Sequence, residues 1–105
     1  IESVPTQPEG RRQVIDGDRL FDLLLPTVAL VSSPDGMAIA HGLRSGGELP
    51  AAIDILLQQA VEATQVIPSA LFREVESVLT DPAEPEMDRE FFAKTLGRYR
   101  ESIGL

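Results

Sequence analysis

Cysteine and tryptophan are absent from this 105-residue chain, and other aromatic residues are few, with four phenylalanines and one tyrosine. The absence of cysteine excludes a disulfide framework, a zinc–thiolate site and a thiol nucleophile. The shortage of aromatic rings leaves little material for the base-stacking platforms that bind single-stranded nucleic acids. The function therefore belongs to classes that need neither thiol chemistry nor aromatic stacking.

Positive charge is also scarce, because 9 lysine and arginine residues stand against 17 aspartates and glutamates, which gives a net charge of −8. Recognition of phosphate needs a cationic face, so we expect no nucleic-acid partner. A hydrophobic fraction of 43% with 25% charged residues is typical of a globular domain, and the length suits a single core.

No apolar run is long enough to cross a membrane. The longest, residues 23–31, is interrupted by Pro26 and Thr27 and is far shorter than a membrane span. Residues 1–13 contain no apolar stretch of the signal-peptide kind, so we expect a cytoplasmic protein without a membrane partner. Their prolines and polar residues show no periodicity, which predicts a flexible lead-in or linker before a single small domain over residues 14–105.

Two apolar runs, residues 28–31 and 37–40, flank the Ser-Pro-Asp-Gly sequence of residues 33–36. This order of residues is typical of a type I turn followed by a left-handed glycine. It predicts a β-hairpin near residues 28–41. Together with the helical segments of the second half, the hairpin predicts an α+β fold that is mainly helical.

The same residues also fit a helix over residues 35–45. Ser33 would be its N-cap, Pro34 its first residue, and the glycines at 46–47 its C-terminal stop. The two glycines inside this helix would each cost about 1 kcal/mol relative to alanine. We therefore favour the hairpin and keep a small all-α helical bundle as the alternative.

Three later segments have helical periodicity. Residues 49–65 are apolar along one face, with only Asp54 interrupting the first half, which predicts the central and most buried helix. A second helix begins after Pro68. The last helix is predicted over residues 87–103, after an acidic connector at residues 81–86 that its prolines make stiff.

His41 is the only side chain whose ordinary pKa lies near neutrality. A hydrolase would need a serine beside it, such as Ser32, Ser33 or Ser45, and the Gly-x-Ser-x-Gly motif is absent. No cluster of residues has the spacing of a metal site. We therefore predict a protein that is not an enzyme, with no catalytic residue, no metal site and no cofactor.

Adjacent apolar residues in the predicted helices, such as the pair Phe91-Phe92, cannot all face one core. We expect a partner protein or a homo-oligomer to cover the excess. This predicts a protein–protein interaction module, such as an adaptor, an assembly chaperone or a regulatory subunit. The residues expected to contact the partner belong to the last helix and the acidic connector: Phe91, Phe92, Leu96, Tyr99, Asp81, Glu84 and Glu86.

A second hypothesis is a regulatory domain that senses an anion or another small ligand through the glycine-rich loop at residues 42–47. Backbone N–H groups ahead of a helix, with an arginine nearby, can hold an anion. The residues expected to bind it are Arg44, Ser45, Gly46 and Gly47. The loop lacks the lysine and hydroxyl residue of a P-loop, and Glu48 places a negative charge beside it.

Residues 28–40, taken as strand, Asp-Gly turn and strand, resemble the opening of roadblock or longin-type domains. The resemblance implies a regulatory module that forms dimers. That family continues with three more strands, whereas this sequence has helical patterns after Gln65. The resemblance therefore does not place the chain in that family.

Overall fold

The computed structural model describes residues 16–104, which form five α-helices that account for 76% of them and include no strand. The helices are α2 (Gly17–Ala29), α3 (Pro34–Ser45), α4 (Leu49–Ala63), α5 (Ser69–Leu79) and α6 (Glu86–Ser102). The fold is a small helical bundle, so the predicted α+β fold is wrong and its all-α alternative is confirmed. The lead-in predicted for residues 1–13 lies outside the described residues.

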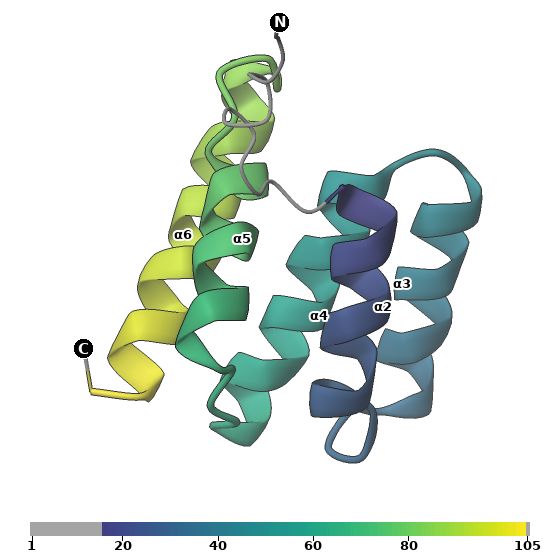
Figure 1. Cartoon of the computed structure of the whole chain (residues 1–105), viewed down its shortest axis with the longest axis vertical. Helices are drawn as coiled ribbons and strands as arrows, with labels where there is room; N and C mark the ends of the chain where they lie inside the picture. Colours follow the sequence, from purple (N-terminus) through teal and green to yellow (C-terminus); the bar gives the residue numbers. More distant parts are fainter. Residues whose placement is uncertain (1–15, 105) are drawn as a thin grey trace, which may run out of the picture.

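The end of α2, a short turn and α3 occupy the place of the β-hairpin predicted near residues 28–41 (Figure 1). Ser33 is the N-cap of α3, because its Oγ accepts a hydrogen bond of 3.0 Å from the Gly36 N–H. Pro34 follows as the first helical residue, where a missing N–H costs nothing. The residues that suggested a turn therefore start a helix, and the strands on which the roadblock resemblance depended do not exist in this segment.

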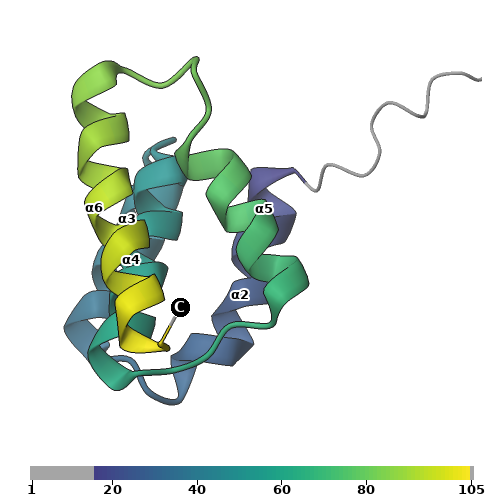
Figure 2. The same cartoon turned by 90° about the vertical axis from the view of Figure 1, so that its left-hand side faces the viewer.

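Helix α4 lies at the centre of the bundle and contacts the other four helices. Helices α2 and α3 cover one side of it, and α5 and α6 cover the other (Figures 1 and 2). Its buried apolar residues are Ala52, Ile53, Leu56, Leu57 and Ala60. The prediction of a central, buried helix in this segment is therefore confirmed, and its apolar surface is covered from both sides.

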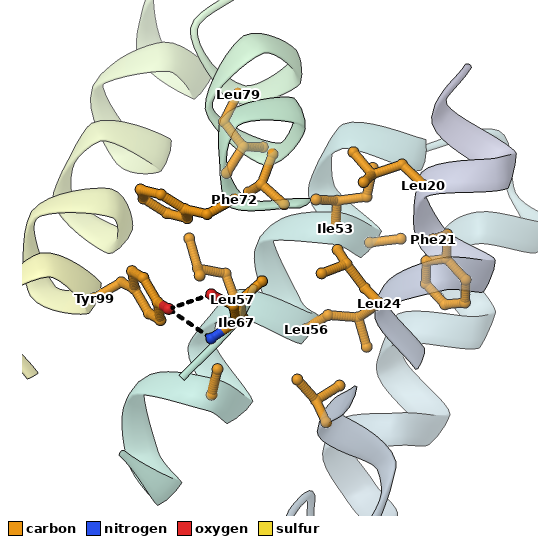
Figure 3. Close-up of a cluster of buried hydrophobic side chains, with 14 of the residues drawn as sticks. Leu20, Phe21, Leu24, Ile53, Leu56, Leu57, Ile67, Phe72, Leu79 and Tyr99 are labelled. Carbon is orange, nitrogen blue, oxygen red and sulfur yellow. Dashed lines mark hydrogen bonds between the residues drawn. The ribbon is translucent and has the colours of Figure 1, made fainter. Parts of the chain in front are cut away.

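The hydrophobic core runs without a break from α2 to α6 (Figure 3). On one side of α4, Leu24 of α2 points toward Leu56. On the other side, the rings of Phe72 from α5 and Tyr99 from α6 pack together, with their centroids 4.6 Å apart. A single hydrophobic core therefore includes residues of all five described helices, and α4 lies at its centre.

A glycine lies where α3 approaches the Gln59 side chain of α4. A Cβ atom on Gly36 would lie 2.4 Å from Cδ of Gln59, a buried residue of α4. Gln59 Oε1 also accepts a hydrogen bond of 3.1 Å from the Ser33 N–H, which ties the turn between α2 and α3 to α4. Gly36 therefore allows α3 to lie close to Gln59 of α4, and it does not form the β-turn that the sequence suggested.

Tyr99 joins α6 to the connection between α4 and α5. Its side chain is fully buried, and its hydroxyl oxygen accepts a hydrogen bond of 2.7 Å from the Ile67 N–H. The hydroxyl in turn donates toward the Ile67 carbonyl oxygen at 3.5 Å (Figure 3). Because Ile67 is buried in a segment without helical hydrogen bonds, the tyrosine supplies the partner that its backbone needs.

We expect Tyr99→Phe to lower the free energy of unfolding by about 1–3 kcal/mol, because it leaves the buried Ile67 N–H without an acceptor. Urea denaturation followed by circular dichroism measures the change. The control is Ser102→Ala, which removes a hydroxyl that donates to the Tyr99 carbonyl oxygen at the half-buried end of α6. Its expected cost is about 0.5 kcal/mol or less. Equal stability of Tyr99→Phe and the wild-type protein would contradict the role assigned to the phenol.

Candidate functional site

Helix α6 divides the predicted partner-contact residues between the core and the surface. Phe92, Leu96 and Tyr99 have only 4%, 2% and 0% of their surface exposed and belong to the hydrophobic core. Phe91 is 54% exposed, with its ring packed edge-on against Phe92 at a centroid distance of 6.4 Å. In the folded protein, Phe91 is thus the only one of these four aromatic and aliphatic residues that a partner can reach.

Met87 lies one helical turn before Phe91 and is 82% exposed. Residues four apart on a helix share a face, so Met87 and Phe91 form an exposed apolar pair in the first half of α6. Met87 was not among the residues predicted from the sequence to contact a partner, although its spacing of four residues from Phe91 is a signal that could have identified it.

Carboxylates surround this apolar pair in the sequence. Five occur within residues 81–90: Asp81, Glu84, Glu86, Asp88 and Glu90. Glu84 is half-buried and the other four are exposed. The segment also has backbone contacts of its own, because Asp81 Oδ1 accepts a hydrogen bond of 2.9 Å from the Ala83 N–H and the Glu84 carbonyl oxygen accepts one of 3.1 Å from Arg89 Nε.

We call Met87 and Phe91, together with the predicted carboxylates Asp81, Glu84 and Glu86, the acidic–apolar surface. It lies at the end of the bundle where α5 leads into α6 (Figures 1 and 2). Its two apolar side chains are exposed on a helix that the core holds in place, and its carboxylates lie on both the connector and the helix.

Arg44, predicted to bind an anion, lies on the last turn of α3 and is paired with carboxylates of α2. Its guanidinium donates hydrogen bonds to Asp22 at 2.7 Å and to Asp18 at 3.2 Å. It also lies over the ring of Phe21, 4.7 Å from the centroid. The hydrogen bond from Arg44 lowers the pKa of the Asp22 carboxyl. These contacts join α3 to α2. Because the guanidinium is already paired with two carboxylates, its positive charge is not free to bind an anion.

The other residues of the predicted anion site, Ser45, Gly46 and Gly47, are exposed at the end of α3. The N–H groups of the two glycines donate to carbonyl oxygens of Gly42 and Arg44, so they complete the last turn of the helix. The described part of the chain has no pocket at this loop or elsewhere. The geometry adds no support for anion binding, which stays a prediction.

His41 is exposed on α3 and packs edge-to-face against Phe21 at a centroid distance of 5.6 Å. The hydroxyls of Ser32 and Ser33 serve the backbone, because Ser32 Oγ donates to the Val28 carbonyl oxygen and Ser33 Oγ caps α3. Within residues 16–104, no group of three histidine, cysteine or acidic side chains is placed to hold a metal ion.

Asp54 is a buried carboxylate in the middle of α4, with 1% of its surface exposed. Its Oδ2 accepts a hydrogen bond of 2.7 Å from the Gln58 amide, whereas Oδ1 has no hydrogen-bond partner among the described residues. Burial raises the pKa of Asp54, and the Gln58 amide, the Thr95 hydroxyl and the charge of Arg98 partly oppose this rise. From the sequence, Asp54 was expected only to interrupt the apolar face of its helix.

The chain matches no model of a protein family, no curated protein and no solved structure. Among the described helices, none combines the length and the apolar character that a membrane span requires. Its function is therefore inferred from its own residues.

We expect Asp54→Asn to raise the free energy of unfolding at neutral pH by about 1 kcal/mol, because it removes a buried charge and keeps an oxygen for the Gln58 amide. The folded protein raises the pKa of Asp54 above its ordinary value of 3.8, so the wild-type protein gains stability from this group as the pH falls toward that value. The advantage of the variant should therefore shrink between about pH 7.5 and about pH 4.5.

Urea denaturation of both proteins at the two pH values measures this difference. Glu101→Gln, which neutralises an exposed carboxylate on α6, is the control, and we expect it to leave stability nearly unchanged at neutral pH. An advantage of Asp54→Asn that is the same at both pH values would contradict the assignment.

Proposed function

We propose that this protein is a protein-binding module without enzymatic activity, and that its partner docks on the acidic–apolar surface. The observation that supports this most is the exposure of Met87 and Phe91, 82% and 54%, one turn apart on the same helix. Single exposed apolar residues are ordinary on protein surfaces. A pair on one helical face, however, offers neighbouring anchors that a partner can bury.

The charges around the pair define the chemistry of the partner. A segment with lysine or arginine beside apolar side chains can pair with the carboxylates while it buries Met87 and Phe91. Acidic residues also favour the first turn of a helix, which accounts for Glu86 without any partner. The helix dipole does not account for Asp81 in the connector or for the exposure of Phe91.

An adaptor, an assembly chaperone and a regulatory subunit all act by such contacts, so the proposal covers these three roles. Two apolar anchors with a charged margin suit a transient contact better than a permanent one. Methionine adapts its shape to different partners, which also fits transient binding. Anion sensing is not carried forward as a second function, because Arg44 is already paired with Asp18 and Asp22.

Two synthetic peptides test the proposal. The first is an amphipathic helix of leucine and lysine, and the second has each lysine replaced by glutamate. In an NMR titration of the ¹⁵N-labelled protein, we expect the lysine peptide to bind and the glutamate peptide not to bind. Binding of the lysine peptide should shift the amide signals of residues 81–91, and it should weaken as salt is added.

Phe91→Ala and Met87→Ala should each weaken binding of the lysine peptide by about 5–10-fold, which is the loss expected from truncating an anchor. Leu30→Ala is the matched control, because Leu30 is an exposed apolar residue that caps the end of α2. The turn from α2 to α3 lies at the end of the bundle opposite the α5–α6 connector (Figure 1). This substitution should leave the affinity unchanged. Equal binding of the two peptides, or signal shifts centred outside residues 81–91, would show that the surface has been misassigned.

A further inference from the structure

Sulfur occurs at only two positions of this chain, which has the methionines Met37 and Met87 and no cysteine. Thioethers and thiols are the side-chain groups that peroxides oxidise under mild conditions, and their susceptibility follows their exposure to solvent. Because the chain lacks cysteine, oxidation by peroxide is concentrated on its two methionines. The fold determines which of the two reacts first.

The structure exposes one methionine and packs the other. Met87 is 82% exposed in the first turn of α6, whereas Met37 of α3 is half-buried and packs against the hydrophobic core. Peroxide must reach the sulfur atom itself, and packing against the core restricts its access to Met37. Met87 therefore offers the more accessible thioether to an oxidant.

We propose that Met87 is a modification site, and that its oxidation to the sulfoxide weakens docking at the acidic–apolar surface. This inference rests on the proposed function, in which Met87 is one of two apolar anchors. In the reaction, the Met87 sulfur attacks one oxygen of hydrogen peroxide, the O–O bond breaks, and an S–O bond and one water molecule form. The sulfur is oxidised by two electrons, and the peroxide is reduced by two.

Oxidation changes the apolar part of the acidic–apolar surface and leaves its acidic part unchanged. A sulfoxide is polar, so its oxygen loses bound water when an apolar side chain of the partner covers it. The carboxylates Asp81, Glu84 and Glu86 keep their charge, and binding should therefore weaken without a change in its salt dependence. Met87 is not a core residue, so the oxidised chain should remain folded.

The modification can be reversed. Methionine sulfoxide reductases, one for each epimer of the sulfoxide, restore the thioether with electrons from thiols. Two thiols become a disulfide, and the sulfoxide oxygen leaves as water. The surface thus has two states that differ by a single oxygen atom, one with higher and one with lower affinity for the partner.

Brief treatment of the complete chain with hydrogen peroxide tests the proposal. Trypsin places the two methionines in separate peptides, residues 20–44 and 74–89, in which mass spectrometry detects an added oxygen. We expect Met87 to react at least about 3-fold faster than Met37. The protein oxidised at Met87 should bind the lysine peptide about 5–10-fold more weakly than the untreated protein. Its midpoint of urea denaturation should not change, and treatment with both reductases should restore the affinity.

Two matched variants separate the effects of the two sulfur atoms. Met87→Leu keeps an apolar side chain without sulfur, so peroxide should leave the affinity of this variant where it was before treatment. Met37→Leu removes the other sulfur and should lose affinity after peroxide as the wild-type protein does. Met87→Gln places a polar side chain at the same position and should bind about as weakly as the oxidised protein.

The proposal is overturned if Met37 reacts as fast as Met87, or if the protein oxidised at Met87 binds the lysine peptide as tightly as before. It is also overturned if Met87→Leu loses affinity after peroxide to the same extent as the wild-type protein. These outcomes leave the proposed function intact, because the untreated protein still binds. If the untreated protein does not bind the lysine peptide, the proposed function fails and this inference fails with it.

Discussion

The burial of α4 is the constraint on which the rest of this structure depends. This helix is apolar around most of its circumference, so it is stable in water only when other helices cover it from both sides. The pairs α2–α3 and α5–α6 provide that cover (Figure 1). The cover uses up the apolar faces of these helices, which is why Phe92, Leu96 and Tyr99 are core residues and not a docking surface. Few large apolar side chains remain exposed outside this core, and Met87 and Phe91 of α6 are two of them.

The long, periodic segments could be predicted from the sequence, because their signal extends over several turns. The predicted helices 49–65 and 87–103 correspond to α4 and α6, with ends that differ by one or two residues. The structure of the segment around residues 33–36 could not be predicted from the sequence, because the same four residues are typical both of a turn and of the start of a helix. The contact of Gly36 and Ser33 with Gln59, 26 residues from Ser33, stabilises the helix, and no local pattern reveals it.

For the candidate site, the sequence did not separate buried residues from exposed ones, because Phe91, Phe92, Leu96 and Tyr99 were all predicted to contact a partner. Phe92, Leu96 and Tyr99 recur at spacings of four and three residues, which is the pattern that burial against a core selects. Phe91 and Met87 lie outside that pattern, and this departure is the signal that could have separated them. Asp54 was visible as a charge in an apolar segment. Its burial depends on how closely α6 covers α4, which the sequence of α4 alone does not contain.

The net charge of −8 influences binding mainly through its distribution. Carboxylates are dense near the α5–α6 connector and absent from the α2–α3 turn and the α4–α5 connection at the opposite end. A basic segment that docks at the first end, as we propose, therefore gains an attraction between opposite charges that the other end does not offer. This gain should fall as salt is added, because salt screens the charges.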